Sequence, residues 1–83
     1  MEGPRMATLI HKETEIHYQV DGELLERLRR KVGYETQQEL ADVCTQVAGR
    51  GAPYTQQFIQ KLERPGLNNI SPEFASVLEQ IFH

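Results

Sequence analysis

The sequence has a single cysteine, Cys44, no tryptophan, and no apolar run near the roughly 20 residues that a membrane-spanning helix needs. A lone cysteine cannot form an internal disulfide, which favours a reducing compartment. The first residues, MEGPRM, lack the apolar core of a secretory signal. We therefore expect a cytoplasmic protein without membrane contact.

An excess of positive charge is also missing, because nine Lys and Arg stand against twelve Asp and Glu, a formal net charge of −3. Nucleic-acid binders are usually basic, so the total counts against that function. The charges are unevenly distributed, however, and residues 43–72 contain Arg50, Lys61 and Arg64 against Glu63 alone. Local charge decides where a phosphate backbone can rest, so this part of the chain stays a candidate for nucleic-acid contact.

Residue patterns typical of enzyme active sites are missing as well. The sequence offers no credible Ser/His/Asp or Cys/His arrangement, no Gly-rich phosphate loop and no pair of carboxylates suited to a cleft. His11 and His17 could share one face of an extended segment, but two histidines without a third ligand make a poor metal site. We expect neither enzyme activity nor a cofactor nor a metal.

Length and composition predict one small domain: 83 residues, of which 39% are hydrophobic and 25% charged. Residues 1–20 are expected to form a tail and an arm, and residues 21–83 a helical domain. The arm is rich in β-branched residues over 8–20 and alternates only loosely, which predicts either an extended segment or a weak hairpin turning near Lys12–Thr14.

The first two predicted helices follow from capping residues and apolar spacing. Asp21 is a plausible N-cap for a helix that ends before Gly33. Thr36 and Glu39 form a capping box that opens a second helix, ended by the glycines and proline of residues 49–53. Cys44 lies on the apolar stripe of this second helix. It is interpreted as a small buried hydrophobe, with a reactive thiol as the alternative.

Two further helices follow the same logic. Thr55 caps a short helix that ends at residue 63 or 64, before Pro65 and Gly66, and Ser71-Pro72 opens the last one. The short helix is the informative one, because the side opposite its apolar residues is rich in glutamine. A glutamine amide can pair with two atoms of adenine in the major groove, although glutamine is also an ordinary exposed helix residue.

Two segments carry a resemblance to a known family. TQQELA (36–41) followed by TQQFIQKLE (55–63) resembles the helix-turn-helix of the lambdoid phage repressor and Cro family, of XRE type. LRRKVGYET (28–36) is similar to that family's first helix and its link, and the resemblance covers roughly residues 24–82. It implies an all-α, lambda-repressor-like fold of four to five short helices, preceded by the extended or hairpin arm.

The sequence departs from the family between the two segments. Family members usually connect these helices by a tight turn, whereas Thr45–Tyr54 intervene here. The POU-specific domain, a relative of the same fold, also has a longer second helix and a longer turn, and this chain resembles it in that respect. The departure leaves the geometry of the turn open.

The resemblance implies roles for individual residues. The expected base contacts are Gln56, Gln57, Gln60 and Lys61. The expected phosphate contacts are Gln37, Arg50, Thr55, Arg64, Asn68 and Asn69, of which the last two lie in an expected loop after the third helix. Arg29 and Glu63 match a partly buried ion pair that ties the first helix to the end of the third.

These observations predict a sequence-specific DNA-binding transcription regulator, a repressor, whose partner is double-stranded DNA and which is associated with the nucleoid. The expected binding form is a homodimer on a palindromic site, with the arm at 8–20 and the last helix as candidate dimer surfaces. The alternative is a protein-interaction module, antitoxin-like or bridging, on the same fold. The net charge of −3 and the few basic residues after the third helix favour that alternative.

Overall fold

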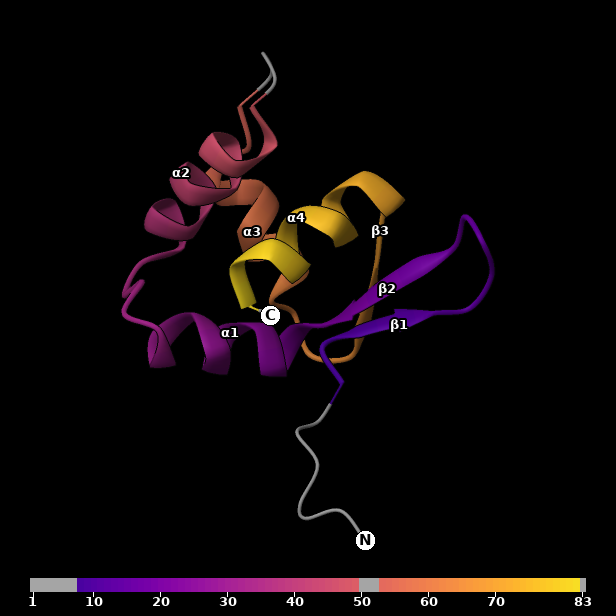
Figure 1. Ribbon diagram of the computed structural model, residues 1–83. Coiled ribbons are helices and arrows are strands. Elements are labelled where there is room, and N and C mark those ends of the chain that lie inside the picture. The colour runs from indigo at the N-terminus through magenta and orange to yellow at the C-terminus, as the bar shows by residue number, and fades with distance from the viewer. Residues whose placement is uncertain (1–7, 50–52, 83) are drawn as a thin grey trace, which may run out of the picture.

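A computed structural model describes residues 8–49 and 53–82 of the chain (Figure 1). The elements in chain order are β1 (Ile10–Lys12), β2 (Tyr18–Asp21), α1 (Gly22–Lys31), α2 (Gln37–Ala48), α3 (Gln56–Leu62), β3 (Leu67–Ile70) and α4 (Pro72–Phe82). The three strands form one antiparallel sheet in the order β1-β2-β3. In Figure 1 the sheet lies at one end of the molecule, and α2 lies on the far side of α4 from it.

The prediction of an all-α fold is therefore wrong, and the architecture is α+β. The error lies mainly at β3, whose sequence LNNI was expected to be a loop that carries Asn68 and Asn69. Asparagine is depleted in strands, and a strand of four residues that begins two residues after Pro65 and ends two residues before Pro72 is too short a pattern to recognise. The strand forms because it pairs with β2, far away in the chain, with Tyr18 opposite Ile70 and Asp21 opposite Leu67.

Of the two alternatives for the N-terminal segment, the hairpin is the one that forms. Ile10 pairs with Val20 and Lys12 with Tyr18, so the connecting loop covers residues 13–17 rather than turning at Lys12–Thr14. Since β2 is the central strand, Val20 is completely buried against the helices. The hairpin is thus joined through β3 to the helical part of the chain, which supplies the packing that an isolated hairpin lacks.

The helices begin where their capping residues predict. Asp21 accepts a hydrogen bond from the Leu24 amide, Thr55 from the Phe58 amide and Ser71 from the Phe74 amide. At α2 both halves of the capping box are present, because the Thr36 side chain binds the Glu39 amide and the Glu39 carboxylate binds the Thr36 amide. Local sequence is sufficient for these starts, since each cap satisfies a backbone donor of the same turn.

One core holds the sheet and the helices together. Its largest fully buried side chains are Phe74, Leu25, Leu40, Ile59, Leu78, Val20 and Cys44. Every helix and the central strand contribute to this set, so the domain has no separate second core within the described residues. Across residues 8–49 and 53–82, no helix combines the length and apolar character needed to cross a membrane.

Candidate nucleic-acid interface

Helix α3 packs its apolar side on the core, with Phe58 half-buried, and exposes its polar side. Ile59 and Leu62 are its buried residues, and both belong to the core. All four expected base contacts, Gln56, Gln57, Gln60 and Lys61, are exposed. Arg64, just after the helix, is exposed too, and neither it nor Lys61 forms an ion pair with another described residue. The exposed side of α3 is therefore a surface of amides and two cations.

A buried ion pair fixes the end of α3. Nε of Arg29 lies 2.7 Å from Oε2 of Glu63, and its Nη2 lies 3.2 Å from Oε1, so the contact is bidentate. Both side chains are nearly inaccessible, with 3% and 4% of their surface exposed. The third guanidinium nitrogen, Nη1, donates to the Tyr34 carbonyl at 3.0 Å, which ties the link before α2 to the same group. The pair expected from the resemblance is thus present.

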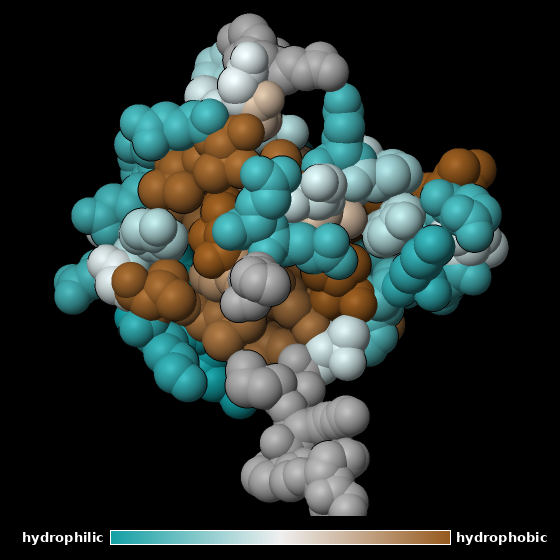
Figure 2. Space-filling view, in the orientation of Figure 1, coloured by the Kyte–Doolittle hydropathy of each residue, from teal (hydrophilic) through white to brown (hydrophobic). Residues whose placement is uncertain are grey.

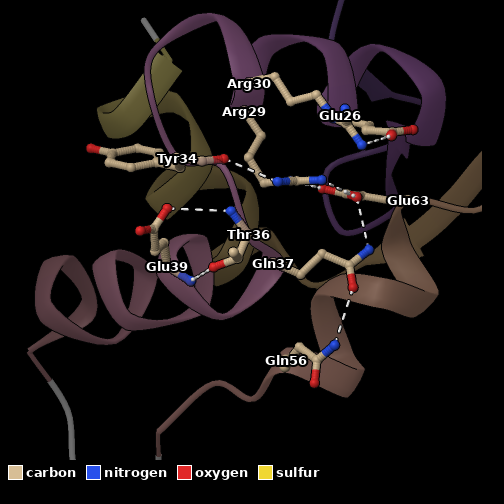
Figure 3. Close-up of polar contacts among 9 residues, drawn as sticks. All are labelled: Glu26, Arg29, Arg30, Tyr34, Thr36, Gln37, Glu39, Gln56 and Glu63. Atoms are coloured by element: carbon tan, nitrogen blue, oxygen red, sulfur yellow. Dashed lines mark hydrogen bonds and ion pairs between the residues drawn. The ribbon is translucent and has the colours of Figure 1, made fainter.

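Two glutamines extend this pair to the surface (Figure 3). Nε2 of Gln37, the first residue of α2, donates to Oε1 of Glu63 at 2.9 Å. Nε2 of Gln56, the first residue of α3, donates to Oε1 of Gln37 at a longer 3.4 Å. The chain Arg29–Glu63–Gln37–Gln56, which we call the relay, runs from the core to the N-terminal end of α3.

The relay determines which way both amides point. A carboxylate can only accept hydrogen bonds, so Gln37 must turn its NH₂ group toward Glu63 and its carbonyl toward Gln56. Gln56 must then present its own NH₂ group to Gln37. One hydrogen of that group and the carbonyl oxygen of Gln56 stay available at the surface. This donor–acceptor edge is the one that pairs with adenine N7 and N6.

The expected phosphate contacts divide into several classes. Thr55 and Arg64 are exposed beside α3, and Thr55 also caps the helix. Gln37 is half-buried, with its carbonyl and one N–H used in the relay. Asn69 is exposed on β3, and its Oδ1 accepts a hydrogen bond from the side-chain Nε2 of Gln19 at 3.2 Å. Arg50 lies outside the described residues.

Asn68 has a structural role that sequence reasoning missed. Its Nδ2 donates to the Leu62 carbonyl and to the Arg64 carbonyl, each at 2.9 Å. Both N–H groups of the amide are thereby used to satisfy the C-terminal end of α3, which leaves no donor for a phosphate. We therefore omit Asn68 from the contact surface. Its place in the sequence, Pro-Gly-Leu-Asn, carries no signal that distinguishes a structural role from a phosphate contact.

Gly22 is a second structural residue that sequence reasoning missed. A Cβ atom at this position would lie 1.9 Å from the Arg64 carbonyl oxygen and 2.8 Å from that of Leu62. The Gly22 amide donates to the Gly66 carbonyl at 2.9 Å. The start of α1 thus packs directly against the backbone that follows α3. A glycine at the first position of a helix gives no hint of such an approach.

The unusual connection between α2 and α3 is anchored where it returns to the core. Gly49 ends α2 in the left-handed region, with φ of 65°. The Tyr54 amide then donates to Oγ1 of Thr45 at 2.9 Å, and the hydroxyl of Thr45 donates to the Ala41 carbonyl. The Tyr54 ring packs on Phe58 and Phe74, with centroid distances of 5.5 and 4.8 Å. The start of α3 is therefore held in place despite the longer connection.

Comparisons of the chain with protein-family models, with curated proteins and with solved structures give no match.

Proposed function

We propose that this chain is a sequence-specific DNA-binding transcription regulator of the phage repressor type, with α3 as its recognition helix. The relay is the observation that carries the proposal. It holds the amide of Gln56 in one orientation at an exposed helix end, where packing gives no reason for such an arrangement. A side-chain amide that is already ordered before DNA binds loses little conformational freedom when it pairs with a base, which favours recognition.

Charge and exposure around α3 support the same proposal. Lys61 and Arg64 are exposed without an ion-pair partner among the described residues, so each can neutralise a phosphate. Glu63, the only acid in the sequence between residues 43 and 72, is buried against Arg29 and does not oppose them. Residues 56–64 thus expose two cations and no carboxylate, although the net charge of the chain is −3.

The regulator would act as a dimer that represses transcription by occupying its site. One helix-turn-helix module buries only about 600–1,000 Å² on DNA, and this one has few cations. A second copy on a palindrome doubles both the area and the phosphate contacts, with half-sites about 34–36 Å apart.

The test is a selection of random duplex DNA on the purified chain, repeated at two salt concentrations. We expect an enriched palindrome, with an affinity that falls by about 0.9 log units per log unit of salt for each phosphate neutralised. Enrichment that disappears in the variant Gln56→Ala assigns the selection to α3. Binding that is indifferent to sequence, or no binding, would refute the proposal and favour the protein-interaction module.

A further inference from the structure

The connection between α2 and α3 is longer than the turn of about three or four residues that joins the helices of a helix-turn-helix. From Ala48, the last residue of α2, the chain passes through Gly49 and the segment Pro53–Tyr54 before α3 begins at Gln56. A tight turn fixes the angle between two helices because it leaves the chain no other path. A longer connection does not, so the direction of α3 depends on contacts with the rest of the fold.

Thr45, in the third turn of α2, supplies such a contact through its hydroxyl group. Its Oγ1 donates to the Ala41 carbonyl at 2.9 Å and accepts a hydrogen bond from the Tyr54 amide at 2.9 Å. The first bond lies within the helix and is common for a threonine, whereas the second joins residues nine positions apart. The hydroxyl thus holds the residue that precedes Thr55, the N-cap of α3.

Packing does not enclose the segment that Thr45 holds. The Tyr54 ring packs on Phe58 and Phe74. Elsewhere, Pro53 and Tyr54 border a half-open cavity of about 500 Å³ between the C-terminal end of α2 and α4. Figure 2 shows hydrophobic residues at the surface over α2 and α4 on this face of the molecule. A directional hydrogen bond therefore adds a constraint that the open packing beside the cavity does not give.

The start of α3 is joined to α2 at two separate places. Gln56 donates to Gln37, the first residue of α2, and Tyr54 donates to Thr45, eight residues further along the same helix. Eight residues span about 12 Å of a helix axis. One attachment would let α3 pivot, whereas two attachments at this separation define its direction.

We propose that Thr45 is a positioning residue for DNA recognition, whose hydroxyl sets the direction of α3 relative to α2 and so places Gln56 and Gln57 at the base edges. Thr45 acts through the backbone of Tyr54 and does not touch DNA. The inference rests on the proposed function, because the direction of α3 affects affinity only if α3 enters a groove. A binding constellation has to be held to about 10–20° of its productive geometry for its contacts to form.

The first test compares two variants of the same residue. Thr45→Val keeps the branched shape and removes the hydroxyl, and Thr45→Ser keeps the hydroxyl. Their affinities for the selected duplex and for random DNA are measured by fluorescence anisotropy, under conditions where both variants are folded. We expect Thr45→Val to bind the selected duplex about tenfold more weakly, the size of one lost base contact, and random DNA with nearly native affinity. Thr45→Ser should stay within about twofold of the native chain on both.

Ser71→Ala is the matched control for a loss of stability. Ser71 also accepts a hydrogen bond from one backbone amide, that of Phe74 at 3.1 Å, but it caps α4, which contains no residue proposed to contact DNA. Urea unfolding of every variant compares the losses of stability. We expect Ser71→Ala to keep the native preference for the selected duplex.

The second test needs no DNA. Residual dipolar couplings of the backbone amides, measured by NMR, give the direction of α3 relative to α2 in each variant. We expect a change of more than about 10° in Thr45→Val and none in Thr45→Ser or Ser71→Ala. If the native chain binds no DNA, the proposed function fails, and these couplings still decide whether Thr45 sets the direction of α3.

Three results would overturn the proposal. The first is an unchanged direction of α3 in Thr45→Val. The second is an equal loss of affinity in Thr45→Ser, which would assign the effect to packing of the side chain. The third is an equal loss of affinity in Ser71→Ala, which would assign the effect to the stability of the fold.

Discussion

The side-chain nitrogen of Gln37 lies 2.9 Å from Oε1 of Glu63, so a glutamine of α2 donates a hydrogen bond to a buried carboxylate. Glu63 also receives two N–H donors from Arg29, at 2.7 and 3.2 Å. The same carboxylate thereby joins the end of α3 to α1 and to the start of α2. Stability and the geometry of the α3 surface are linked at this one group, and the first two predictions separate them.

Replacing Arg29 by methionine is expected to destabilise the fold by about 3–5 kcal/mol, because it leaves the Glu63 carboxylate buried without its cation. Urea unfolding of the two proteins measures the loss. Arg30→Met is the matched control, since Arg30 forms an exposed pair with Glu26 and should contribute under about 1 kcal/mol. Equal losses in the two variants would contradict the assignment.

The relay predicts that Gln37 acts on DNA affinity through Gln56. Gln56→Ala should weaken binding to the selected site by about 1–3 kcal/mol and relax the preference at one base pair. Gln37→Ala should lose part of that preference at the same base pair, because the amide of Gln56 is then free to turn. In the double variant the losses should be less than additive. Fully additive losses, measured by fluorescence anisotropy, would show that the two residues act independently.

Base and phosphate contacts should differ in their salt dependence. Gln57→Ala is expected to cost about 1–3 kcal/mol on the selected site and little on random DNA, as loss of a base contact does. Arg64→Ala should weaken binding on every sequence and reduce the log–log salt slope by about one. If Gln57→Ala weakens all sequences equally, Gln57 is a phosphate contact.

Gly22→Ala should destabilise the chain although alanine is the better helix former. The added Cβ would meet the Arg64 carbonyl oxygen at 1.9 Å, so the backbone after α3 must move. Overpacking of this kind costs about 1–3 kcal/mol, against a gain of at most about 1 kcal/mol in helix propensity. Thermal unfolding compares it with Glu23→Ala, an exposed neighbour on the same helix that should change little. An increase in melting temperature would contradict the close approach.

The buried thiol of Cys44 should make the fold less stable at alkaline pH. Burial raises the pKa of its thiol from 9.0 to about 12. Between these values the unfolded chain releases the thiol proton and the folded chain keeps it, so the free energy of unfolding falls as pH rises, by up to about 1.4 kcal/mol per pH unit. Urea unfolding at pH values around 8 to 11 should show a steeper fall for the native chain than for Cys44→Ala. Parallel curves would show that the thiol does not contribute.

The sequence by itself determined the helices, because their signals are local. Asp21, Thr36, Thr55 and Ser71 each bind an amide of the turn that they begin, so no other part of the chain is needed to place these starts. The exposed glutamines of α3 follow from the same periodicity, since the apolar residues of a short helix face the core. The family resemblance also predicted the ion pair between Arg29 and Glu63, which the structure contains.

Only the tertiary structure decided the sheet and the roles that depend on distant neighbours. Residues 67–70 have no strand pattern of their own and become β3 through pairing with β2. Asn68 became a structural residue because the carbonyl groups at the end of α3 lie within its reach, and Gly22 because the Arg64 carbonyl lies where a side chain would be. The relay likewise requires α1, α2 and α3 to meet at Glu63. A capping residue acts on its own turn, whereas these contacts join segments whose separation in space is set by the packed core.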